Sequence, residues 1–297
     1  SADICTDPTC YHGKEEAHRD ALRKMAEKKG MRFVQGDEAE DMFASTWQDR
    51  LEDGYTNLAQ VRNDITTPDG RTGLTLRELL GNLDDPDGLV AEGLLLIDSG
   101  AQYLGGTTDI TRVWPIGTPS AAQRSDYTRV LKGTINLSRA RFPLGTLSPH
   151  LDTLARAPLW EAGLDFGHGT GHGVGYFLNV HEGPQSISRA VPDASMAMWP
   201  GMITSIEPGL YRDGRWGIRI ENLGLNVSVG APDEFGEYLA FETLTLCPID
   251  TRCLDHGLLR DDERQWLNGY HAEVRRRLAP RLSGAALDWL VARTAPV

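Results

Sequence analysis

The stretch GLLLIDSGAQYLGGTTDITRVW, residues 93–114, decides the fold of this chain. Its residues 94–98 form a short apolar run that is typical of a buried strand. Residues 107–114 are rich in β-branched side chains, and the glycines before them favour a tight turn. The sequence therefore predicts an antiparallel hairpin, in which Asp98 closes the first strand and Asp109 lies in the return strand.

Both aspartates of this hairpin are in unusual places for an acid. A carboxylate that closes an apolar strand loses hydration, which is unfavourable unless the carboxylate is paired or binds a metal ion. Aspartate is also disfavoured among β-branched strand residues. If the hairpin forms, Asp98 and Asp109 can point to one spot, where their charges raise one pKa unless cations neutralise them. A cap or turn is the ordinary alternative for either residue alone.

Three of the chain's eight histidines lie within fourteen residues: His168, His172 and His181. The His-x3-His spacing is that of helical zinc proteases, but Gly169 takes the place of their glutamate, and the neighbouring glycines disfavour a helix. Glycine lets the backbone approach a ligand or metal closely. We therefore expect this group to contain metal-binding or catalytic residues, although any one of the three could be an ordinary core or surface histidine.

Two glutamates complete the candidate set. Glu207 lies in SIEPG and Glu221 in GIRIEN, where burial of an acid is costly without a partner. A salt bridge is the alternative for each, with Arg219 as the obvious partner of Glu221. Carboxylates that bridge two ions about 3.5–4 Å apart build a two-metal site. An oxygen-rich donor set favours Mn²⁺, Mg²⁺ or Co²⁺ over a thiolate-rich zinc site. The predicted ligands are Asp98, Asp109, His172, Glu207 and Glu221.

Composition limits the class of protein. With 297 residues, of which 40% are hydrophobic, the chain can form one large domain or two modest ones. A net charge of -12 argues against electrostatic binding to nucleic acid or acidic membranes. The sequence has no apolar run of about 18 residues, so no transmembrane helix is expected. It starts at Ser1 without a signal-peptide pattern. The four cysteines are expected to be free thiols in the cytoplasm, the alternative being a Cys5–Cys10 or Cys247–Cys253 disulfide.

The texture of the sequence changes near residue 89. Before it, the pattern predicts charged or amphipathic helices at 15–30 and 37–51. After it, short β runs dominate residues 163–226, and residues 239–249 form a further predicted strand. Helices are predicted at 121–141, 147–160, 261–278 and 284–293.

Several segments together resemble the signature segments of the aminopeptidase P (Xaa-Pro aminopeptidase) family. They are DSGAQYLGGTTDITR, HGTGHGVGYFLNVHEGP, EPGLY and GIRIEN, and the tail after residue 239 is similar to the extension of the family's cytosolic, eukaryote-like branch. The resemblance covers residues 89–297. It implies an α+β pita-bread (creatinase/aminopeptidase-like) fold, a curved and mostly antiparallel sheet covered by helices. Residues 89–297 would be the metallopeptidase catalytic domain with a C-terminal extension, and 1–88 a divergent helical remnant of an incomplete first half.

The resemblance also assigns roles to residues. Asp98 would bind one metal ion, Asp109 and Glu221 would bridge both, and His172 and Glu207 would bind the other. Glu207 would also transfer a proton, His168 and His181 would be catalytic residues that hydrogen-bond the substrate, and Arg219 would orient Glu221. The cofactors would be two divalent ions, with Mn²⁺ expected and Co²⁺ or Zn²⁺ as alternatives. The substrates would be peptides with proline at the second position, and the assembly would be a homodimer.

The chain departs from the family pattern in three ways. Relatives have two further N-terminal domains, and they carry a substrate-contacting His about twenty residues before the first Asp ligand. Glu78 takes that place here, and residues 52–88 contain no His. Two positions within the motifs also differ: Gly105 stands where relatives often have an acid, and Ile206 stands where a polar residue is common. The alternatives are an inactive pita-bread binding module or a related aminopeptidase of other specificity, such as methionine aminopeptidase. A metal-free creatinase-like hydrolase is disfavoured, because all five ligand positions hold metal-binding residues.

Overall fold

The computed structural model describes residues 93–103, 106–176 and 179–297. These residues all belong to one compact unit, Asn57–Val297. The predicted helices at 15–30 and 37–51, the boundary at residue 88, and the departures at Glu78 and Gly105 lie outside the described residues and stay predictions.

Strands in the described part pair only antiparallel, as the predicted fold requires. They form a four-stranded sheet in the order β3-β10-β9-β6 and three two-stranded groups, β1-β2, β4-β5 and β7-β8. The strands are β1 (Gly93–Tyr103), β2 (Gly106–Ile116), β3 (Arg141–Pro143), β4 (Gly171–His172), β5 (Ser186–Ile187), β6 (Ile203–Ile206), β7 (Gly209–Arg212), β8 (Trp216–Arg219), β9 (Asn222–Asp233) and β10 (Gly236–Thr243). The predicted strand at 239–249 was wrong beyond Thr243, where the chain leaves the sheet.

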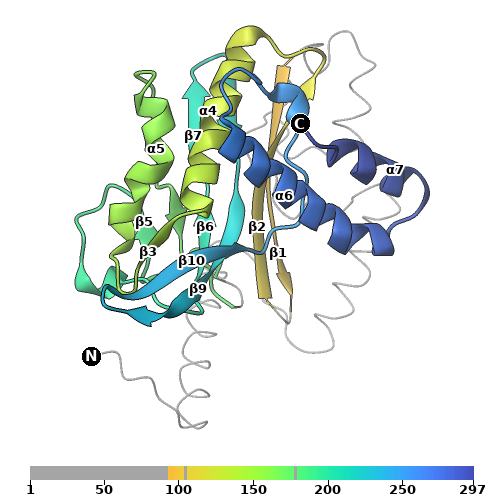
Figure 1. The fold of residues 1–297 in the computed structure, drawn as a ribbon. Coiled ribbons are helices and arrows are strands. Elements are labelled where there is room, and N and C mark those ends of the chain that lie inside the picture. Colours follow the sequence, from red (N-terminus) through yellow and green to blue (C-terminus); the bar gives the residue numbers. More distant parts are fainter. Residues whose placement is uncertain (1–92, 104–105, 177–178) are drawn as a thin grey trace, which may run out of the picture. The chain divides into compact units, whose positions relative to one another are not determined.

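The predicted hairpin is confirmed as β1 and β2 (Figure 1). In its register Asp98 pairs with Thr111, and Gly100 pairs with Asp109. Side chains two residues apart on a strand point to the same face, so Asp98 and Asp109 share a face although they are not direct partners. The apolar run predicts a buried first strand, but most of β1 is only half-buried.

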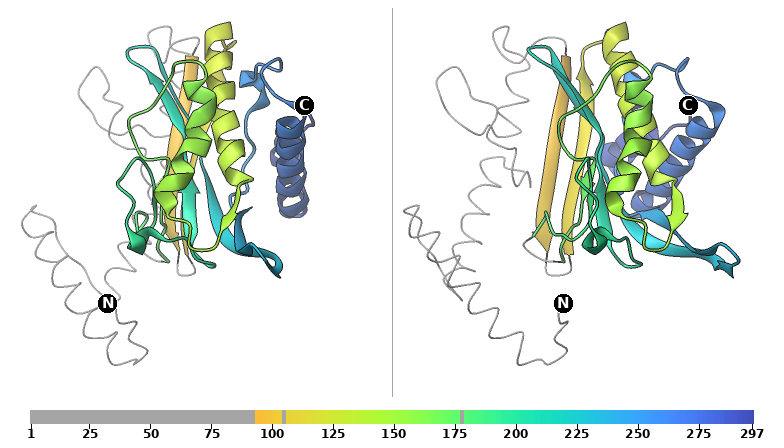
Figure 2. Two further views of the ribbon diagram at one scale, coloured as in Figure 1. Left: turned by 60° about the vertical axis from the view of Figure 1, so that its left-hand side comes forward. Right: turned by 90° about the vertical axis from the view of Figure 1, so that its left-hand side faces the viewer.

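Helices pack on one side of this hairpin. In Figures 1 and 2, α4 (Ala121–Ser138) and α6 (Asp261–Leu278) lie on the same side of β1 and β2. The larger core lies where these two helices meet the hairpin. Side chains such as Val113 of β2, Leu131 of α4 and Leu267 of α6 are fully buried in it. Each such aliphatic side chain contributes about 1.5–3 kcal/mol through burial. This core fixes the strands that carry the candidate site.

The remaining helical segments include counterparts of the predicted helices at 147–160 and 284–293, together with three short 3-10 turns that were not predicted. They are η2 (Ser148–Leu151), α5 (Asp152–Trp160), η3 (Ala194–Met196), η4 (Thr251–Cys253), η5 (Ala279–Arg281) and α7 (Gly284–Arg293). The predicted helix at 147–160 is divided into the 3-10 turn η2 and the helix α5. Among the described residues, no helix combines the length and the apolar character needed to cross a membrane.

Candidate metal centre

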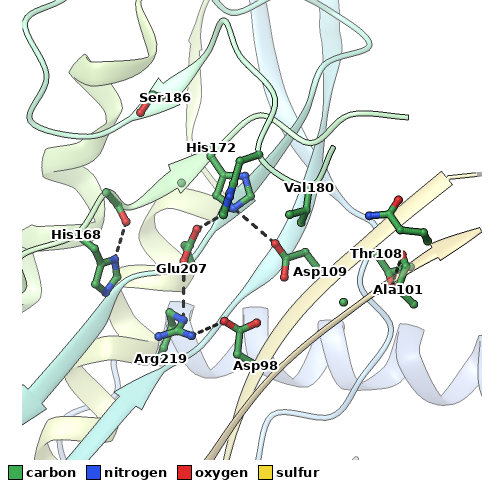
Figure 3. A pocket seen from close by; sticks show the side chains of 15 residues that line it. Asp98, Ala101, Thr108, Asp109, His168, His172, Val180, Ser186, Glu207 and Arg219 are labelled. Carbon is green, nitrogen blue, oxygen red and sulfur yellow. Dashed lines mark hydrogen bonds and ion pairs between the residues drawn. The ribbon is translucent and has the colours of Figure 1, made fainter. Parts of the chain in front are cut away.

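A cavity of about 740 Å³ opens beside the β1-β2 hairpin. Figure 3 shows acidic, histidine and arginine side chains from several elements pointing into it. Glu221 is almost fully buried next to this cavity, with 2% of its surface exposed. The predicted site residues that line the cavity itself are Asp98, Asp109, His168, His172, His181, Glu207 and Arg219.

Three of the five predicted ligands converge on one point. Asp109, His172 and Glu221 each offer one donor atom, and these atoms all lie within 4.8 Å of one another. One carboxylate oxygen of Glu221, Oε1, is buried and has no hydrogen-bond partner among the described residues. An unpartnered buried carboxylate oxygen is costly, and a cation would satisfy it. The donor chemistry at this point therefore fits a divalent metal ion.

Like charges gather at the same point. Burial raises the pKa of Glu221 well above its usual value, and the nearby charges of Glu207 and Asp109 raise it further. Burial also raises the pKa of Asp98, although Arg219 opposes this. Carboxylates with raised pKa values in one cleft are typical of functional sites. Their mutual repulsion would be relieved by bound cations.

The His172 imidazole lies between two carboxylates. Its Nε2 is 3.2 Å from Glu207 Oε1 and 3.5 Å from Asp109 Oδ2. Burial lowers the pKa of His172, but hydrogen bonds to Asp109 and Glu207 outweigh it and raise the pKa to about 10. A cation at Nε2 would have to displace this proton, because only the neutral imidazole binds metal.

Ser205 is a site residue that the sequence reasoning missed. The His172 backbone N–H donates to Ser205 Oγ at 2.9 Å, and the Ser205 hydroxyl donates to Glu207 Oε1 at 2.9 Å. A Cβ at Gly171 would collide with the carbonyl oxygen of Ser205. The glycine therefore allows β4 and β6 to approach closely and bring His172 and Glu207 together. Ile206, one of the departures from the family pattern, is buried in a second hydrophobic core with side chains such as Phe142 and Met198.

Arg219 contacts Asp98 rather than Glu221. Its Nη2 donates to Asp98 Oδ2 at 2.6 Å, and its Nε donates to Thr111 Oγ1 at 3.1 Å. The Thr111 hydroxyl in turn donates to Glu221 Oε2 at 2.7 Å. The predicted link from Arg219 to Glu221 therefore runs through Thr111, a residue that the sequence reasoning did not single out.

His168 is held by hydrogen bonds at both ring nitrogens. Nδ1 is 2.7 Å from the Gly169 carbonyl oxygen, so this nitrogen carries the proton. Nε2 then accepts from the Tyr211 hydroxyl at 2.8 Å. Burial lowers the pKa of His168, which keeps the ring neutral at pH 7. A substrate that bonds to Nε2 would have to replace the Tyr211 hydroxyl.

His181 packs against His172, one of the predicted metal ligands. Its ring lies 4.3 Å from the ring of His172 in an edge-to-face arrangement, and the side chain lines the cavity. This position agrees with a substrate-contacting role, and it places both non-ligand histidines at the same cavity.

The loop that carries His168 is fastened to α5. The Arg156 guanidinium is 1% exposed and forms an ion pair with Asp152 at 2.6 Å. It also donates to the carbonyl oxygens of Phe166 at 2.7 Å and His168 at 2.8 Å. The Thr170 hydroxyl donates to Asp152 Oδ1 at 2.5 Å. This buried pair therefore fixes the backbone leading to both His168 and His172.

Comparison with known proteins places these features in one family. The model of metallopeptidase family M24 matches residues 15–226, and that of the C-terminal region of peptidase M24 matches residues 237–297. The chain therefore belongs to metallopeptidase family M24, and its fold is the pita-bread fold expected from the sequence.

Individual relatives are similar over about two thirds of the chain. Aminopeptidase P2 of Arabidopsis thaliana is 51% identical over 207 residues, which are 69% of this chain and 29% of that protein. A probable Xaa-Pro aminopeptidase P of Coprinopsis cinerea is 48% identical over 206 residues, or 68% and 33%. The chain thus spans about a third of the length of these curated relatives.

One solved structure is similar in both sequence and fold. It is the X-prolyl aminopeptidase of Caenorhabditis elegans, described as a cytosolic enzyme with a di-nuclear active site. The identity is 44%, the TM-score is 0.64, and the match covers 69% of this chain and 34% of that one.

Proposed function

We propose that this chain is a two-metal aminopeptidase that hydrolyses the bond between an N-terminal residue and a following proline. The observation that carries the proposal is the convergence of Asp109, His172 and Glu221 beside the cavity, where the Oε1 of Glu221 has no hydrogen-bond partner among the described residues. The similarity to Xaa-Pro aminopeptidases supports the choice of substrate.

The proposed ligand roles are those that the family resemblance implies, and the convergence of Asp109, His172 and Glu221 supports them. Asp109 and Glu221 would bridge the two ions, Asp98 would bind one of them, and His172 and Glu207 would bind the other. Two divalent cations held in this way would polarise the scissile carbonyl and lower the pKa of a water molecule. We propose Mn²⁺, with Co²⁺ or Zn²⁺ as alternatives, because oxygen donors dominate the set.

Other groups at the site position the peptide and move the proton. Burial raises the pKa of Glu207, but hydrogen bonding to His172 outweighs it and leaves the pKa below its usual value. Glu207 lines the cavity next to His172 and would accept a proton in the reaction. His168 and His181 line the cavity and would hydrogen-bond the peptide. Arg219 would hold Asp98 directly and Glu221 through Thr111.

The cellular setting belongs to the same proposal. The Caenorhabditis elegans protein is described as cytosolic, and we propose the cytoplasm for this chain too. The predicted homodimer stays a prediction.

Release of arginine from the tripeptide Arg-Pro-Pro tests the activity. With Mn²⁺ present, the protein is expected to release free arginine from Arg-Pro-Pro, measured by chromatography. The matched control is Arg-Ala-Pro, which differs only at the second residue and is expected to release far less.

Each other outcome selects an alternative. Equal release from both peptides would indicate an aminopeptidase without proline preference, and cleavage restricted to Met-Ala-Ser would indicate a methionine aminopeptidase. Bound Mn²⁺ without any cleavage would favour the inactive binding module.

A further inference from the structure

The backbone of Glu221 is held on both sides by β2. Its N–H donates to the Thr111 carbonyl oxygen at 3.1 Å, and its own carbonyl oxygen accepts from Arg112 Nη1 at 2.5 Å. The Thr111 hydroxyl holds the carboxylate itself. Asp109 lies on the same strand as Thr111, two residues away and on the same face. The separation of the two bridging carboxylates therefore depends on how Glu221 is fixed to this strand.

Arg112 is a buried cation whose acceptors are all uncharged. It is 3% exposed, and it forms no ion pair with any carboxylate in the described part of the chain. Removing a charged group from water costs free energy, so a buried charge is weak evidence of a stabilising role. The hydrogen bonds of Arg112 therefore call for a role other than stabilisation. The acceptors are the carbonyl oxygens of Thr111, Glu221, Cys247 and Pro248, the Oδ1 of Asn222, and the hydroxyl of Tyr270.

Half of these acceptors come from the C-terminal region, residues 237–297. They are the carbonyl oxygens of Cys247 and Pro248, at 2.9 and 3.1 Å, and the Tyr270 hydroxyl, at 2.8 Å. Tyr270 also donates to the Cys247 carbonyl oxygen at 2.7 Å. Its ring stacks on Trp266 with a centroid distance of 5.6 Å. The packed helix α6 therefore delivers one hydroxyl to the guanidinium behind Glu221.

We infer that the C-terminal region takes part in the metal centre, with Tyr270 as a positioning residue that sets the place of Glu221 through Arg112. The inference rests on the proposed metal centre and assigns α6 a role beyond packing. The chain of contacts is short: Tyr270 hydroxyl, Arg112 guanidinium, Glu221 carbonyl oxygen. Partners that orient metal ligands are worth about 10–100-fold in metal affinity.

Replacing Tyr270 by phenylalanine tests this role, because it removes the hydroxyl and keeps the ring stacked on Trp266. The Tyr270→Phe variant is expected to bind Mn²⁺ about tenfold more weakly than the wild type. The dissociation constant is measured by titration followed by electron paramagnetic resonance of free Mn²⁺. With EDTA present, the thermal transition of the variant should fall by only a few degrees.

Trp266→Phe is the matched control, since it disturbs the same ring stack without touching the Arg112 contacts. It should lower the thermal transition while leaving Mn²⁺ affinity within about twofold of wild type. Unchanged affinity in Tyr270→Phe, with wild type binding Mn²⁺, would overturn the inference alone. An equal loss of affinity in Trp266→Phe would also overturn it, because packing would then explain both. A wild type that binds no Mn²⁺ would overturn the proposed metal centre and this inference together.

Discussion

Replacing Glu221 by glutamine is expected to lower the Mn²⁺ content from two ions to about one per chain. A neutral amide cannot bridge two cations as a carboxylate does, and losing several kcal/mol of charge stabilisation corresponds to a fall in kcat/KM of at least about a thousandfold. Glutamine keeps the size of the side chain and an oxygen that can accept from Thr111. Metal content is measured by mass spectrometry of the dialysed protein, and kcat/KM by arginine release.

The fold of this variant should survive. Burial raises the pKa of Glu221 well above normal, so its charged form destabilises the folded state at neutral pH, and a neutral side chain removes that cost. In EDTA the thermal transition of Glu221→Gln is therefore expected not to fall. Glu242→Gln, an exposed position on β10, is the control and should change neither metal content nor rate. A Glu221→Gln protein that still bound two ions would remove Glu221 from the ligand set.

Replacing Arg156 by methionine is expected to lower the free energy of unfolding by about 3–5 kcal/mol. The change leaves the Asp152 carboxylate buried without its ion-pair partner. It also removes the donors to the Phe166 and His168 carbonyl oxygens, so the loop before His172 loses its anchor on α5. Urea denaturation followed by circular dichroism measures the loss.

Two further variants separate the charge effect from general disruption. Adding Asp152→Asn to Arg156→Met removes the uncompensated charge and should recover part of the stability, because the amide oxygen can still accept from Thr170. Arg129→Met is the control, since within the described part of the chain Arg129 makes a single hydrogen bond, of 3.3 Å, to the Pro158 carbonyl oxygen. It should cost about 1 kcal/mol. If Arg156→Met lowered the free energy of unfolding by no more than Arg129→Met does, the anchoring role of Arg156 would be contradicted.

Local sequence carried enough information for the hairpin but not for its surroundings. The β-branched run and the glycine turn act within residues 93–114, so they predict the pairing that brings Asp98 and Asp109 to one face. The partners of Arg219 are set by the packing of β8 against β1. This packing brings Arg219 to Asp98, which is 121 residues away in the sequence. Proximity in the sequence favoured Glu221 instead, and that contact turned out to run through Thr111.

Ser205 and Arg112 show why other site residues were missed. Ser205 is one of many serines, and its role appears only when Gly171 lets β4 approach β6. Arg112 had a usable signal, because an arginine inside a β-branched strand must find partners if it is buried. Its partners, however, come from residues up to 158 positions away. Such contacts are fixed by the tertiary fold and not by local pattern.

Anomalous diffraction at the manganese absorption edge, from crystals of this protein grown with Mn²⁺, tests the two-metal centre most directly. The account predicts two anomalous peaks about 3.5–4 Å apart, with Asp109 and Glu221 between them, His172 and Glu207 on one peak and Asp98 on the other. A single peak, or peaks away from the point where Asp109, His172 and Glu221 converge, would contradict it.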